Sequence, residues 1–417
     1  MRPLPLLHVF SAFVLGTAFA APVAGQRPSP PVTGHARIPH VAPESVSMST
    51  ERLAQIDEVV RRGISAGGFP GAAVIIGRRG AIVWERGYGT LDWQSGVAVD
   101  AERTMYDVAS LTKVVATTAA SMVLADRGKL RLDEPVIHYL PTFKGGSKGE
   151  VTIRDLLAHQ SGLPAGRILS RRGAGPASAR RLALTTPLVR VPGTKSEYSD
   201  LGLDVVGFAI ERITHEPLDK YLRRAVYTPL GMSSTMFRPG PTLRSRIAPT
   251  EAQNARGEVH DRNARALGGV AGHAGLFATA GDLAVFAQVM LDGGVAGSTR
   301  LFSDSTVQTF TLPGPGWRGL GWETCSGGGS CGRYLSPRAF GHTGFTGTLM
   351  WIDPERDLFV IVLTNWIHGR AQGGTAPVAV LHDVRADVVD LAALAITDGE
   401  ELPLPWRFRS ELQIGWW

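Results

Sequence analysis

The segments of this chain that resemble β-strands lie near its two ends, and helical patterns occupy the middle. Near the N-terminal end, "GAAVIIGRRGAIVWERGYG" indicates two short strands around a turn at residues 78–80. Near the other end, "GTLMWID" and "LFVIVLTNW" flank the turn sequence "PERD". Residues from about 130 to 280 show short helical patterns that glycine and proline interrupt. This order predicts an α+β fold, in which both chain ends build one central antiparallel sheet flanked by helices and the middle forms a mainly helical insertion.

Longer helices are predicted next to this sheet. One begins at Ser49, a second at Ser110 and a third at Thr279, and a fourth spans about residues 377–396. The apolar side of the first helix carries Leu53, Ile56, Val59, Val60 and Ile64. Their spacing is that of a helix packed against a core.

Composition sets the size of the core and the class of partner. Of the 417 residues, 44% are hydrophobic, so the chain can bury one large core or two modest ones. The net charge of +6 rests on arginine, because only six of the 43 basic residues are lysine. No basic stretch interleaves aromatic residues, so no nucleic-acid partner is expected. The positive charge is compatible with an association with anionic cell-envelope polymers. The oligomeric state is left open.

The first residues, "MRPLPLLHVFSAFVLGTAFAAPVAGQ", have the layout of a secretory signal peptide. A basic residue precedes an apolar run, and Ala18 and Ala20 form an A-x-A cleavage site. We predict cleavage after Ala20, which makes the mature protein secreted or periplasmic; an uncleaved membrane anchor is the alternative. Residues 21–45 are rich in proline and small residues and are predicted to be a linker to a domain at 46–398.

The two cysteines, Cys325 and Cys331, lie in the glycine-rich stretch "TCSGGGSCG". In an exported protein such a loop could let the pair close a structural disulfide, and the pair is not predicted to bind metal. The predicted C-terminal tail at 399–417 holds three tryptophans, which either pack on the body or contact a partner.

The stretch "VASLTKVVA" holds Ser110 three positions before Lys113. A serine needs a base to become a nucleophile, and a lysine can serve if burial lowers its pKa from about 10.4. Residues i and i+3 of a helix share a face, so the two side chains can touch. The first helical turn also offers unpaired backbone N–H groups to an oxyanion. Taken alone, however, the motif fits a helix-capping serine and a solvated lysine better.

Two features favour the catalytic interpretation. This is the one S-x-x-K motif in the chain, and its lysine stands in an apolar neighbourhood. The sequence otherwise uses arginine as its basic residue, but only a lysine can lose its proton and act as a base. The rival nucleophiles, Ser65 in "GISAG" and Ser330 in "GGSCG", match the G-x-S-x-G elbow. Such an elbow lies between a strand and a helix. The first stretch instead ends a predicted helix and the second lies in a glycine-rich loop, so neither is preferred.

Two further motifs follow the serine–lysine pair. "SEYSD" supplies Tyr198 and Asp200, and "GHTGFTG" supplies His342, Thr343 and Gly344. A Ser-x-x-Lys pair, a Tyr-x-Asn-like motif and a K/H-T-G motif in this order resemble the penicillin-recognising serine hydrolases, and within them the group of class C β-lactamases, D,D-peptidases and esterases. "LLAHQSGLP" and "ALGGVAGHAGLFATAGDLAVF" also look like segments of that group, so the resemblance covers most of the predicted domain. It implies a β-lactamase/transpeptidase-like fold.

The resemblance also implies the catalytic roles. Ser110 would attack a carbonyl group and become acylated, and Lys113 would share its proton. Tyr198 would activate the nucleophile or protonate the leaving group, with a neighbouring ammonium stabilising its anion. The backbone N–H groups of Ser110 and Phe345 would form the oxyanion hole, the latter just beyond an edge strand. No cofactor is implied.

The remaining matched residues would bind substrate. His342, Thr343 and Gly344 would steer a substrate carboxylate or complete the proton network. Asp200 replaces the usual asparagine, and an ionised carboxylate accepts but does not donate hydrogen bonds. It also raises the pKa of Lys113 and repels a substrate carboxylate. His342 stands where many β-lactamases carry lysine, and an imidazole with its ordinary pKa of about 6.5 is only partly charged at neutral pH.

Other histidines lie in predicted loops. His159 in "AHQSG" and His273 in "GHAG" are expected to shape loops beside the cleft; His159 is interpreted as structural, whereas for His273 a functional role stays equally open. His260 and Asp261 are assigned to a loop rather than to a metal site, because no third ligand accompanies them at sensible spacing.

The leading hypothesis is an exported serine hydrolase that forms an acyl-enzyme on Ser110. Its substrate would be an amide or an ester, either a small molecule or a cell-wall peptide or ester, as for a D,D-peptidase/carboxypeptidase-like or esterase-like enzyme. The substitutions at Asp200 and His342 disfavour efficient β-lactam hydrolysis. A class C-type β-lactamase and a non-catalytic binding or regulatory protein of the same fold stay open as alternatives.

Overall fold

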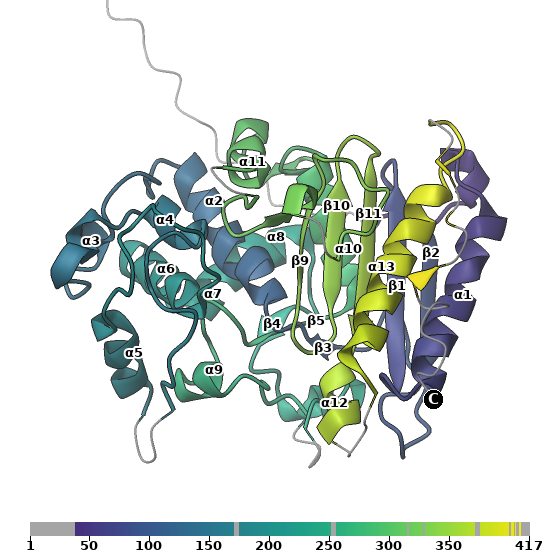
Figure 1. Cartoon of the computed structure of the whole chain (residues 1–417), viewed down its shortest axis with the longest axis horizontal. Coiled ribbons are helices and arrows are strands. Elements are labelled where there is room, and N and C mark those ends of the chain that lie inside the picture. Colours follow the sequence, from purple (N-terminus) through teal and green to yellow (C-terminus); the bar gives the residue numbers. More distant parts are fainter. Residues whose placement is uncertain are drawn as a thin grey trace, which may run out of the picture. The chain divides into compact units, whose positions relative to one another are not determined.

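The computed structural model describes most of the chain after residue 37 (Figure 1). The described residues are 38–170, 175–251, 256–314, 317–327, 330–371 and 376–399, together with 402, 403, 405, 408 and 409. The predicted signal peptide at 1–20 and the tryptophans of the predicted tail lie outside the described residues.

Among the described residues, a six-stranded antiparallel sheet has the order β2-β1-β11-β10-β9-β8 (Figure 1). β1 and β11 pair along their length, from Ala72 opposite Thr364 to Arg78 opposite Leu358. The prediction of one antiparallel sheet built from both chain ends is therefore confirmed. The strands are β1 (Gly71–Arg78), β2 (Ala81–Gly89), β8 (Glu323–Thr324), β9 (Phe340–Thr343), β10 (Leu349–Asp353) and β11 (Leu358–Thr364).

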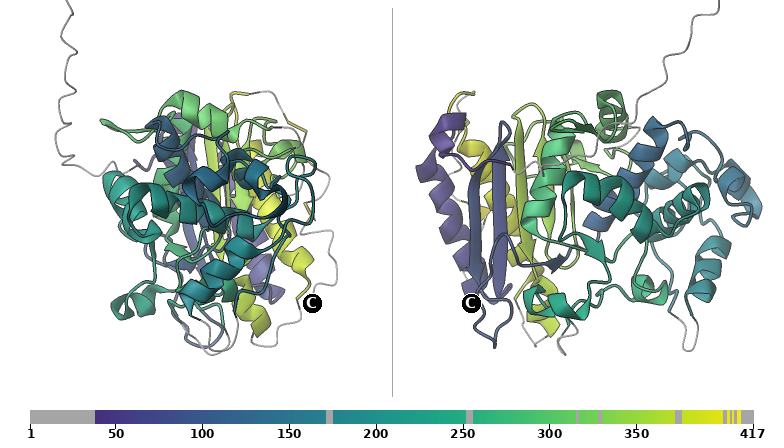
Figure 2. Two further views of the ribbon diagram at one scale, coloured as in Figure 1. Left: turned by 90° about the vertical axis from the view of Figure 1, so that its left-hand side faces the viewer. Right: turned by 180° about the vertical axis from the view of Figure 1, so that it is seen from behind.

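Helices cover both faces of this sheet. α1 and α13 lie together on one face, whereas α10 packs against β1, β10 and β11 on the other (Figures 1 and 2). On β1, Val74 and Ile76 belong to the cluster with α1 and α13, while Ala73 and Ile75 join the larger core. All residues of β1 and β11 are buried for this reason. The three helices are α1 (Thr50–Ser65), α10 (Ala280–Leu291) and α13 (Val378–Leu394).

The chain between β2 and α10 is mainly helical, as predicted. Figures 1 and 2 show helices α3 to α7 beyond the β9 end of the sheet, on the side away from α1. A small antiparallel sheet, β3-β5-β4, lies in the same part of the chain. The elements are β3 (Tyr106–Asp107), η2 (Lys113–Thr118), α2 (Ala119–Asp126), α3 (Val136–Tyr139), η3 (Gly146–Glu150), α4 (Ile153–Leu157), α5 (Pro176–Thr185), α6 (Asp200–Thr214), α7 (Leu218–Leu222), η4 (Arg223–Tyr227), α8 (Thr228–Leu230), β4 (Met236–Phe237), η5 (Pro241–Arg246), α9 (Arg262–Ala266) and β5 (Leu276–Ala278).

Short elements complete the fold. They are η1 (Pro43–Val46), β6 (Val295–Ala296), β7 (Thr299–Arg300), α11 (Asp304–Thr311), η6 (Cys325–Gly327) and α12 (Trp366–Ala371).

The helix that follows Ser110 departs from the predicted α-helix. Its segment η2 is a π-helical turn, and the regular helix α2 begins only at Ala119. All six residues of η2 are buried, including Lys113. Single π-turns occur frequently at functional sites, because the extra residue displaces the side chains around it. The hydrophobic spacing of the sequence carries no signal for this irregularity.

The predicted disulfide is not formed, since both cysteines are free thiols. The Cys331 sulfur points at two main-chain carbonyl oxygens, that of Cys325 at 4.0 Å and that of Gly332 at 3.8 Å. The two thiols also lie within hydrogen-bond reach of each other: this contact raises the pKa of the Cys325 thiol and lowers that of Cys331, so the pair is in contact without an S–S bond.

Two further expectations need adjustment. Within the predicted linker, His40 forms a parallel bridge with Ile82, and the Val41 N–H donates to the Ile82 carbonyl oxygen at 3.1 Å. The folded body therefore begins before residue 46. β9 is also not an edge strand, because the two-residue strand β8 pairs with its Gly341 and Phe340.

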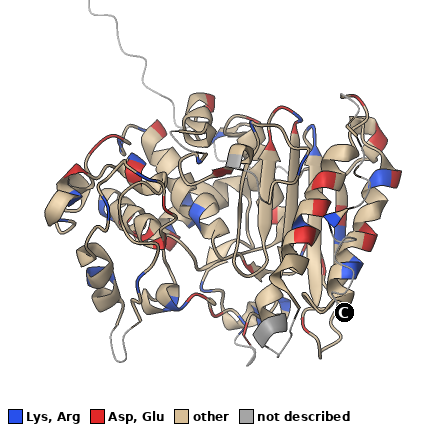
Figure 3. Cartoon of the chain, viewed as in Figure 1, with Lys and Arg blue, Asp and Glu red and all other residues tan. Residues whose placement is uncertain are grey.

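Acidic and basic side chains are interspersed over the described elements (Figure 3). On α1, Arg61 pairs with Asp57 at 3.4 Å and Arg62 pairs with Glu58 at 3.5 Å. Partly exposed ion pairs of this kind add little to stability. Each places an acidic side chain next to a basic one, so the positive net charge is not gathered in one patch on this helix. A search of the described residues finds no helix with the length and apolar character needed to cross a bilayer.

Candidate active site

Ser110 lies on a tight turn that leads from β3 into the helix of Lys113. The buried Asp107 holds this turn: its Oδ1 accepts from the Ala109 N–H at 2.9 Å, and its Oδ2 accepts from the His260 N–H at 2.7 Å. Ala109 has a φ of +46°, which residues with a Cβ rarely adopt. The backbone strain therefore sits directly before Ser110, whose side chain faces a cavity.

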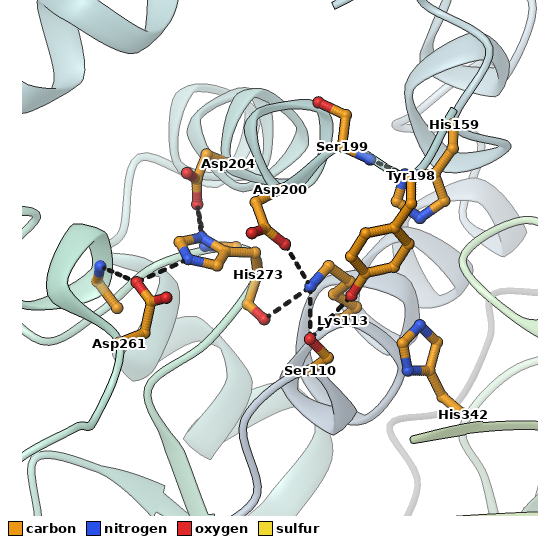
Figure 4. Close-up of polar contacts among 12 residues, drawn as sticks. Ser110, Lys113, His159, Tyr198, Ser199, Asp200, Asp204, Asp261, His273 and His342 are labelled. Atoms are coloured by element: carbon orange, nitrogen blue, oxygen red, sulfur yellow. Dashed lines mark hydrogen bonds and ion pairs between the residues drawn. The ribbon is translucent and has the colours of Figure 1, made fainter. Parts of the chain in front are cut away.

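Lys113 is fully buried and contacts Ser110 (Figure 4). Its Nζ lies 2.9 Å from Ser110 Oγ, 2.8 Å from Asp200 Oδ1 and 3.3 Å from the His273 carbonyl oxygen. The same atom is 4.7 Å from the centre of the Tyr198 ring. The alternative of a lysine on a solvated helix face is therefore wrong.

Tyr198 reaches Ser110 from the loop before α6. Its hydroxyl donates to Ser110 Oγ at 2.8 Å, across 88 residues of sequence. The centre of its ring is 4.7 Å from that of His159 and 5.9 Å from that of His342. The Ser199 N–H donates to His159 Nδ1 at 3.0 Å, which fixes this imidazole against the tyrosine. His159 thus supports the loop that carries Tyr198.

Opposing effects set the charges of the central ion pair. Burial by itself lowers the pKa of Lys113, but the Tyr198 oxygen and the Asp200 carboxylate together raise it above its ordinary value. Burial likewise raises the pKa of Asp200, and the Lys113 charge more than offsets this, so that the net shift is downward. The Asp200 side chain is 31% exposed, whereas that of Lys113 is 0% exposed. Lys113 is therefore an ammonium at neutral pH, and the predicted rise of its pKa through Asp200 is confirmed.

His342 is buried and neutral. Its Nδ1–H donates to the Thr343 carbonyl oxygen at 2.7 Å, and its Nε2 has no hydrogen-bond partner among the described residues. Burial is the main cause that lowers the pKa of His342 to about 4. The Glu323 carboxylate, 4.0 Å from Nε2, opposes this lowering, and the charges of Lys113 and Arg318 add to it. At neutral pH this imidazole therefore carries no positive charge toward a substrate.

The neutrality of His342 predicts a pH effect on stability. Between its ordinary pKa of 6.5 and its folded pKa of about 4, the unfolded chain binds a proton that the folded protein does not. The free energy of unfolding should therefore fall as the pH is lowered through this window. His342→Gln should lose less stability than the native protein between pH 7 and pH 4.5 in chemical denaturation. His215→Asn, at an exposed side chain just after α6, is the control. Parallel pH curves for His342→Gln and the native protein would contradict the assignment.

The loop between β9 and β10 is tied to the turn of Ser110. The Thr346 hydroxyl donates to the Asp107 carbonyl oxygen at 2.7 Å, and the Thr348 hydroxyl donates to the Val108 carbonyl oxygen at 3.0 Å. These bonds link two segments more than 200 residues apart in sequence. The backbone after β9 is therefore positioned relative to the serine rather than free to shift.

A buried arginine supports the same loop from α13. Arg385 donates through Nη2 to the carbonyl oxygens of Gly344 at 2.7 Å and Thr348 at 2.8 Å. Within the described part of the chain, the backbone N–H groups of Ser110 and Phe345 have no acceptor. The Phe345 side chain is 70% exposed and stacks on His260 with ring centres 5.8 Å apart. Both predicted oxyanion donors thus border the cavity without an internal partner.

The cavity over Ser110 has a volume of about 900 Å³. One part of its wall is polar and includes Ser110, Tyr198, Asp200, His273 and His342 together with Arg318 and Glu323. The other part is apolar and comes from α12, α13 and the β9–β10 loop; it consists of Phe345, Trp366, Ile367, Val378 and Leu381. A cavity of this size accommodates a small ligand or the end of a peptide.

Sequence reasoning missed some residues of this site. Arg318 lies 5.3 Å over the Tyr198 ring and donates to Glu323 at 3.2 Å, but no motif marks it. Arg385 carried no distinct signal either, because the last helix also contains Asp383, Asp387 and Asp390. The rival serines do not line the cavity: Ser65 ends α1, and Ser330 accepts a hydrogen bond from the Trp351 indole at 3.3 Å.

Comparison with known proteins identifies relatives over most of the chain. The family model described as Beta-lactamase matches residues 56–383. A protein of Escherichia coli (strain K12) named "Putative D-alanyl-D-alanine carboxypeptidase" is 34% identical over 374 residues, which covers 78% of this chain and 85% of that protein. A protein of the same name from Salmonella agona (strain SL483) is 36% identical over 372 residues, with the same shares covered.

Solved structures share the fold at lower sequence identity. A penicillin-binding protein homologue from Caulobacter crescentus superposes with a TM-score of 0.65 at 21% identity, covering 76% of this chain and 92% of that one. EstCE1, described as a hydrolase with promiscuous acyltransferase activity, gives a TM-score of 0.66 at 22% identity, covering 82% of this chain and 99% of that one. By its fold, its family match and its relatives, this chain belongs to the Beta-lactamase family.

Proposed function

We propose that this protein is an exported serine acyl hydrolase that forms an acyl-enzyme on Ser110. The observation that carries the proposal is the convergence of Lys113 Nζ at 2.9 Å and the Tyr198 hydroxyl at 2.8 Å on Ser110 Oγ, at the wall of a large cavity. A serine in contact with two proton-transferring groups fits nucleophilic catalysis. The family match supports the same conclusion.

The charges of the site assign the proton transfers. In the reactive form Tyr198 has released its hydroxyl proton to solvent, and the Lys113 ammonium stabilises the resulting phenolate. The phenolate oxygen then takes the Ser110 proton. Ser110 Oγ then bonds to the substrate carbonyl carbon. The carbonyl oxygen becomes an oxyanion and accepts hydrogen bonds from the N–H groups of Ser110 and Phe345. Tyr198 returns the proton to the leaving nitrogen or oxygen as its bond to carbon breaks, and water hydrolyses the acyl-serine ester.

The preferred substrate is a peptide with a free C-terminal carboxylate. His342 is neutral and Asp200 is negative, so neither attracts a carboxylate. Arg318 is a second basic side chain next to Tyr198, and its buried Nη1 has no hydrogen-bond partner among the described residues. A guanidinium is well suited to bind a carboxylate. D,D-carboxypeptidase activity on cell-wall peptides agrees with this arrangement and with the name of the relatives.

Ester hydrolysis is the second candidate, because part of the cavity wall is apolar. Phe345 is 70% exposed and Val378 is 48% exposed beside the buried Trp366 and Leu381. Such a wall favours an apolar acyl group. β-Lactam hydrolysis ranks below both, since His342 stands where many related β-lactamases carry lysine and it is neutral here. Thr343 and Gly344 are assigned to substrate binding at the β9 end.

The proposed location is outside the cytoplasm, in the periplasm or secreted. The basic residue, apolar run and A-x-A site before residue 21 support export. Sequencing the N-terminus of the protein recovered from its native host tests this point. A mature protein that begins at residue 21 is expected, and an intact N-terminus would favour the membrane-anchor alternative.

Intact-mass measurement tests the acyl-enzyme directly. The mature protein is incubated separately with a penicillin, an activated ester and a peptide ending in D-alanyl-D-alanine, and adducts are mapped by peptide. We expect an adduct on Ser110 with the penicillin that decays slowly, and release of D-alanine from the peptide. A short-lived adduct with hydrolysed penicillin accumulating would instead indicate a β-lactamase. No adduct and no turnover of any probe would favour a non-catalytic binding or regulatory protein.

The proposed oxyanion loop predicts a large effect at Gly344. A Cβ at this position would lie 2.1 Å from Thr348 Oγ1 and 2.5 Å from the Val108 carbonyl oxygen. Gly344→Ala should therefore displace the loop and lower the acylation rate of Ser110 by about 100-fold or more. Gly281→Ala, on α10 with nothing within 4 Å of the added Cβ, is the matched control and should acylate normally. Stopped-flow acylation rates measure the difference. Equal rates for both variants would contradict the assignment of the Phe345 N–H group to the oxyanion hole.

A further inference from the structure

His273 lies between two carboxylates next to the proposed site (Figure 4). Its Nδ1 is 2.7 Å from Asp204 Oδ1 and its Nε2 is 3.0 Å from Asp261 Oδ1. The imidazole is 2% exposed and Asp204 is 0% exposed. A ring that faces a carboxylate oxygen with each nitrogen donates through both, and therefore carries a positive charge. Burial opposes that charge, but Asp204 and Asp200 outweigh burial and raise the pKa of His273 well above its ordinary value.

The backbone at Gly272, directly before His273, is also held by hydrogen bonds and close packing. The Gly272 N–H donates to Asp204 Oδ1 at 3.0 Å, and the Thr117 hydroxyl donates to the Gly272 carbonyl oxygen at 2.6 Å. A Cβ on Gly272 would lie 1.9 Å from the Leu203 carbonyl oxygen, so the close approach to α6 requires glycine. These contacts hold the His273 carbonyl oxygen where it meets Lys113 Nζ at 3.3 Å.

Asp200 connects this cluster to the nucleophile. It precedes Asp204 by one turn of α6, so both carboxylates lie on the same side of that helix. Figure 4 shows Asp200 between the Lys113 ammonium and the His273 ring. Each charge favours the other: His273 helps to keep Asp200 ionised, and Asp200 helps to keep His273 protonated.

We propose that His273 is a positioning residue of the Ser110 site, whose buried imidazolium offsets the charge of Asp200 while its carbonyl oxygen orients Lys113. This role rests on the proposed acyl-enzyme function. The reactive site carries negative charge on Tyr198 before it takes the Ser110 proton and on the oxyanion afterwards, and an uncompensated Asp200 would oppose both. The charged groups that face His273 are Asp200 and Asp204 of α6, Asp261 before α9, and Lys113 of η2. With the imidazolium in place, an aspartate can occupy the position where the resemblance implies a neutral asparagine.

A double-mutant cycle tests the compensation. His273→Gln, Asp200→Asn and the double variant are compared by the rate of Ser110 acylation with an activated ester. We expect His273→Gln to lower this rate about 30-fold when Asp200 is present and about threefold in the Asp200→Asn background, because the charge to be offset is then gone. His138→Gln, an exposed histidine change on α3, should leave the rate unaltered. Equal effects of His273→Gln in both backgrounds would overturn the proposal.

A second measurement does not depend on the folding of His273→Gln. In the native protein labelled with ¹⁵N-histidine, the His273 ring should show two protonated nitrogens at pH 8. Asp261→Asn keeps a side-chain oxygen at the N-cap of α9 but removes one countercharge, so His273 should lose its proton at lower pH and the acylation rate should fall over the same pH range. A neutral ring at pH 7, or proton loss without a change in rate, would overturn the role. A native protein that is never acylated on Ser110 would instead overturn the proposed function itself.

Discussion

Replacing Ser110 with alanine is expected to abolish hydrolysis of every accepted substrate. Ser110 Oγ is the atom that meets both Lys113 Nζ and the Tyr198 hydroxyl, and no other serine takes that place. Loss of the nucleophile of an acyl-enzyme mechanism lowers turnover by about 10,000-fold or more. Single-turnover kinetics and intact mass measure the loss, and the variant should show no covalent adduct.

The control for this experiment is another small serine change. Ser65→Ala alters the rival G-x-S-x-G serine at the end of α1, whose side chain is exposed and outside the cavity. It should retain the native rate. Ser110→Ala should also unfold at close to the native temperature, since the change removes one oxygen and leaves the Ala109 turn in place. Full hydrolytic activity of Ser110→Ala, or an adduct on Ser65, would refute the proposed nucleophile.

Replacing Lys113 with methionine is expected to damage both catalysis and stability. Without the ammonium, the Tyr198 anion loses the cation at the Ser110 side of its ring, and acylation should slow by about 1,000-fold. Asp200 also loses its ion-pair partner at 2.8 Å. Breaking a buried ion pair costs up to about 3–5 kcal/mol, and the cost here should be at the low end or below it because the Asp200 side chain is 31% exposed. Chemical denaturation measures the stability, and stopped-flow acylation measures the rate.

A double variant separates the two effects. Lys113→Met combined with Asp200→Asn removes both charges, so most of the lost stability should return. The acylation rate should stay low, because the neutral amide does not replace the ammonium beside Tyr198. Recovery of the rate together with the stability would mean that Lys113 serves only to neutralise Asp200.

Much of the fold followed from local patterns. The strands β1 and β2 and the strands β10 and β11 are hairpins whose turns were visible as short polar or glycine-containing sequences. Their hydrophobic runs were continuous because helices cover both faces of the sheet. α1 begins as predicted, since Ser49 accepts from the Arg52 N–H. These features depend on neighbours within a few residues, so the sequence contains the information directly.

The π-turn and the free thiols did not follow from local patterns. η2 depends on how Lys113 and its neighbours pack inside the protein, where all of its residues are buried. The Cys331 sulfur meets backbone oxygens because of the path of its loop, and glycine-rich spacing permits many such paths. Residue types alone do not distinguish these outcomes.

For the site, the sequence by itself pointed to the side chains that we propose carry the chemistry. Ser110 and Lys113 share a helical face, and the order of the later motifs pointed to Tyr198, Asp200 and His342. Only the tertiary structure decided their charge states, because a pKa depends on burial and on charges brought together across the chain. Lys113 stays an ammonium through contacts with groups that lie 88 or more residues beyond the Ser110 turn. The surroundings of the two buried histidines likewise decide their charges. His342 is neutral because its Nε2 is buried without a hydrogen-bond partner among the described residues, and His273 is charged because it is buried between two carboxylates.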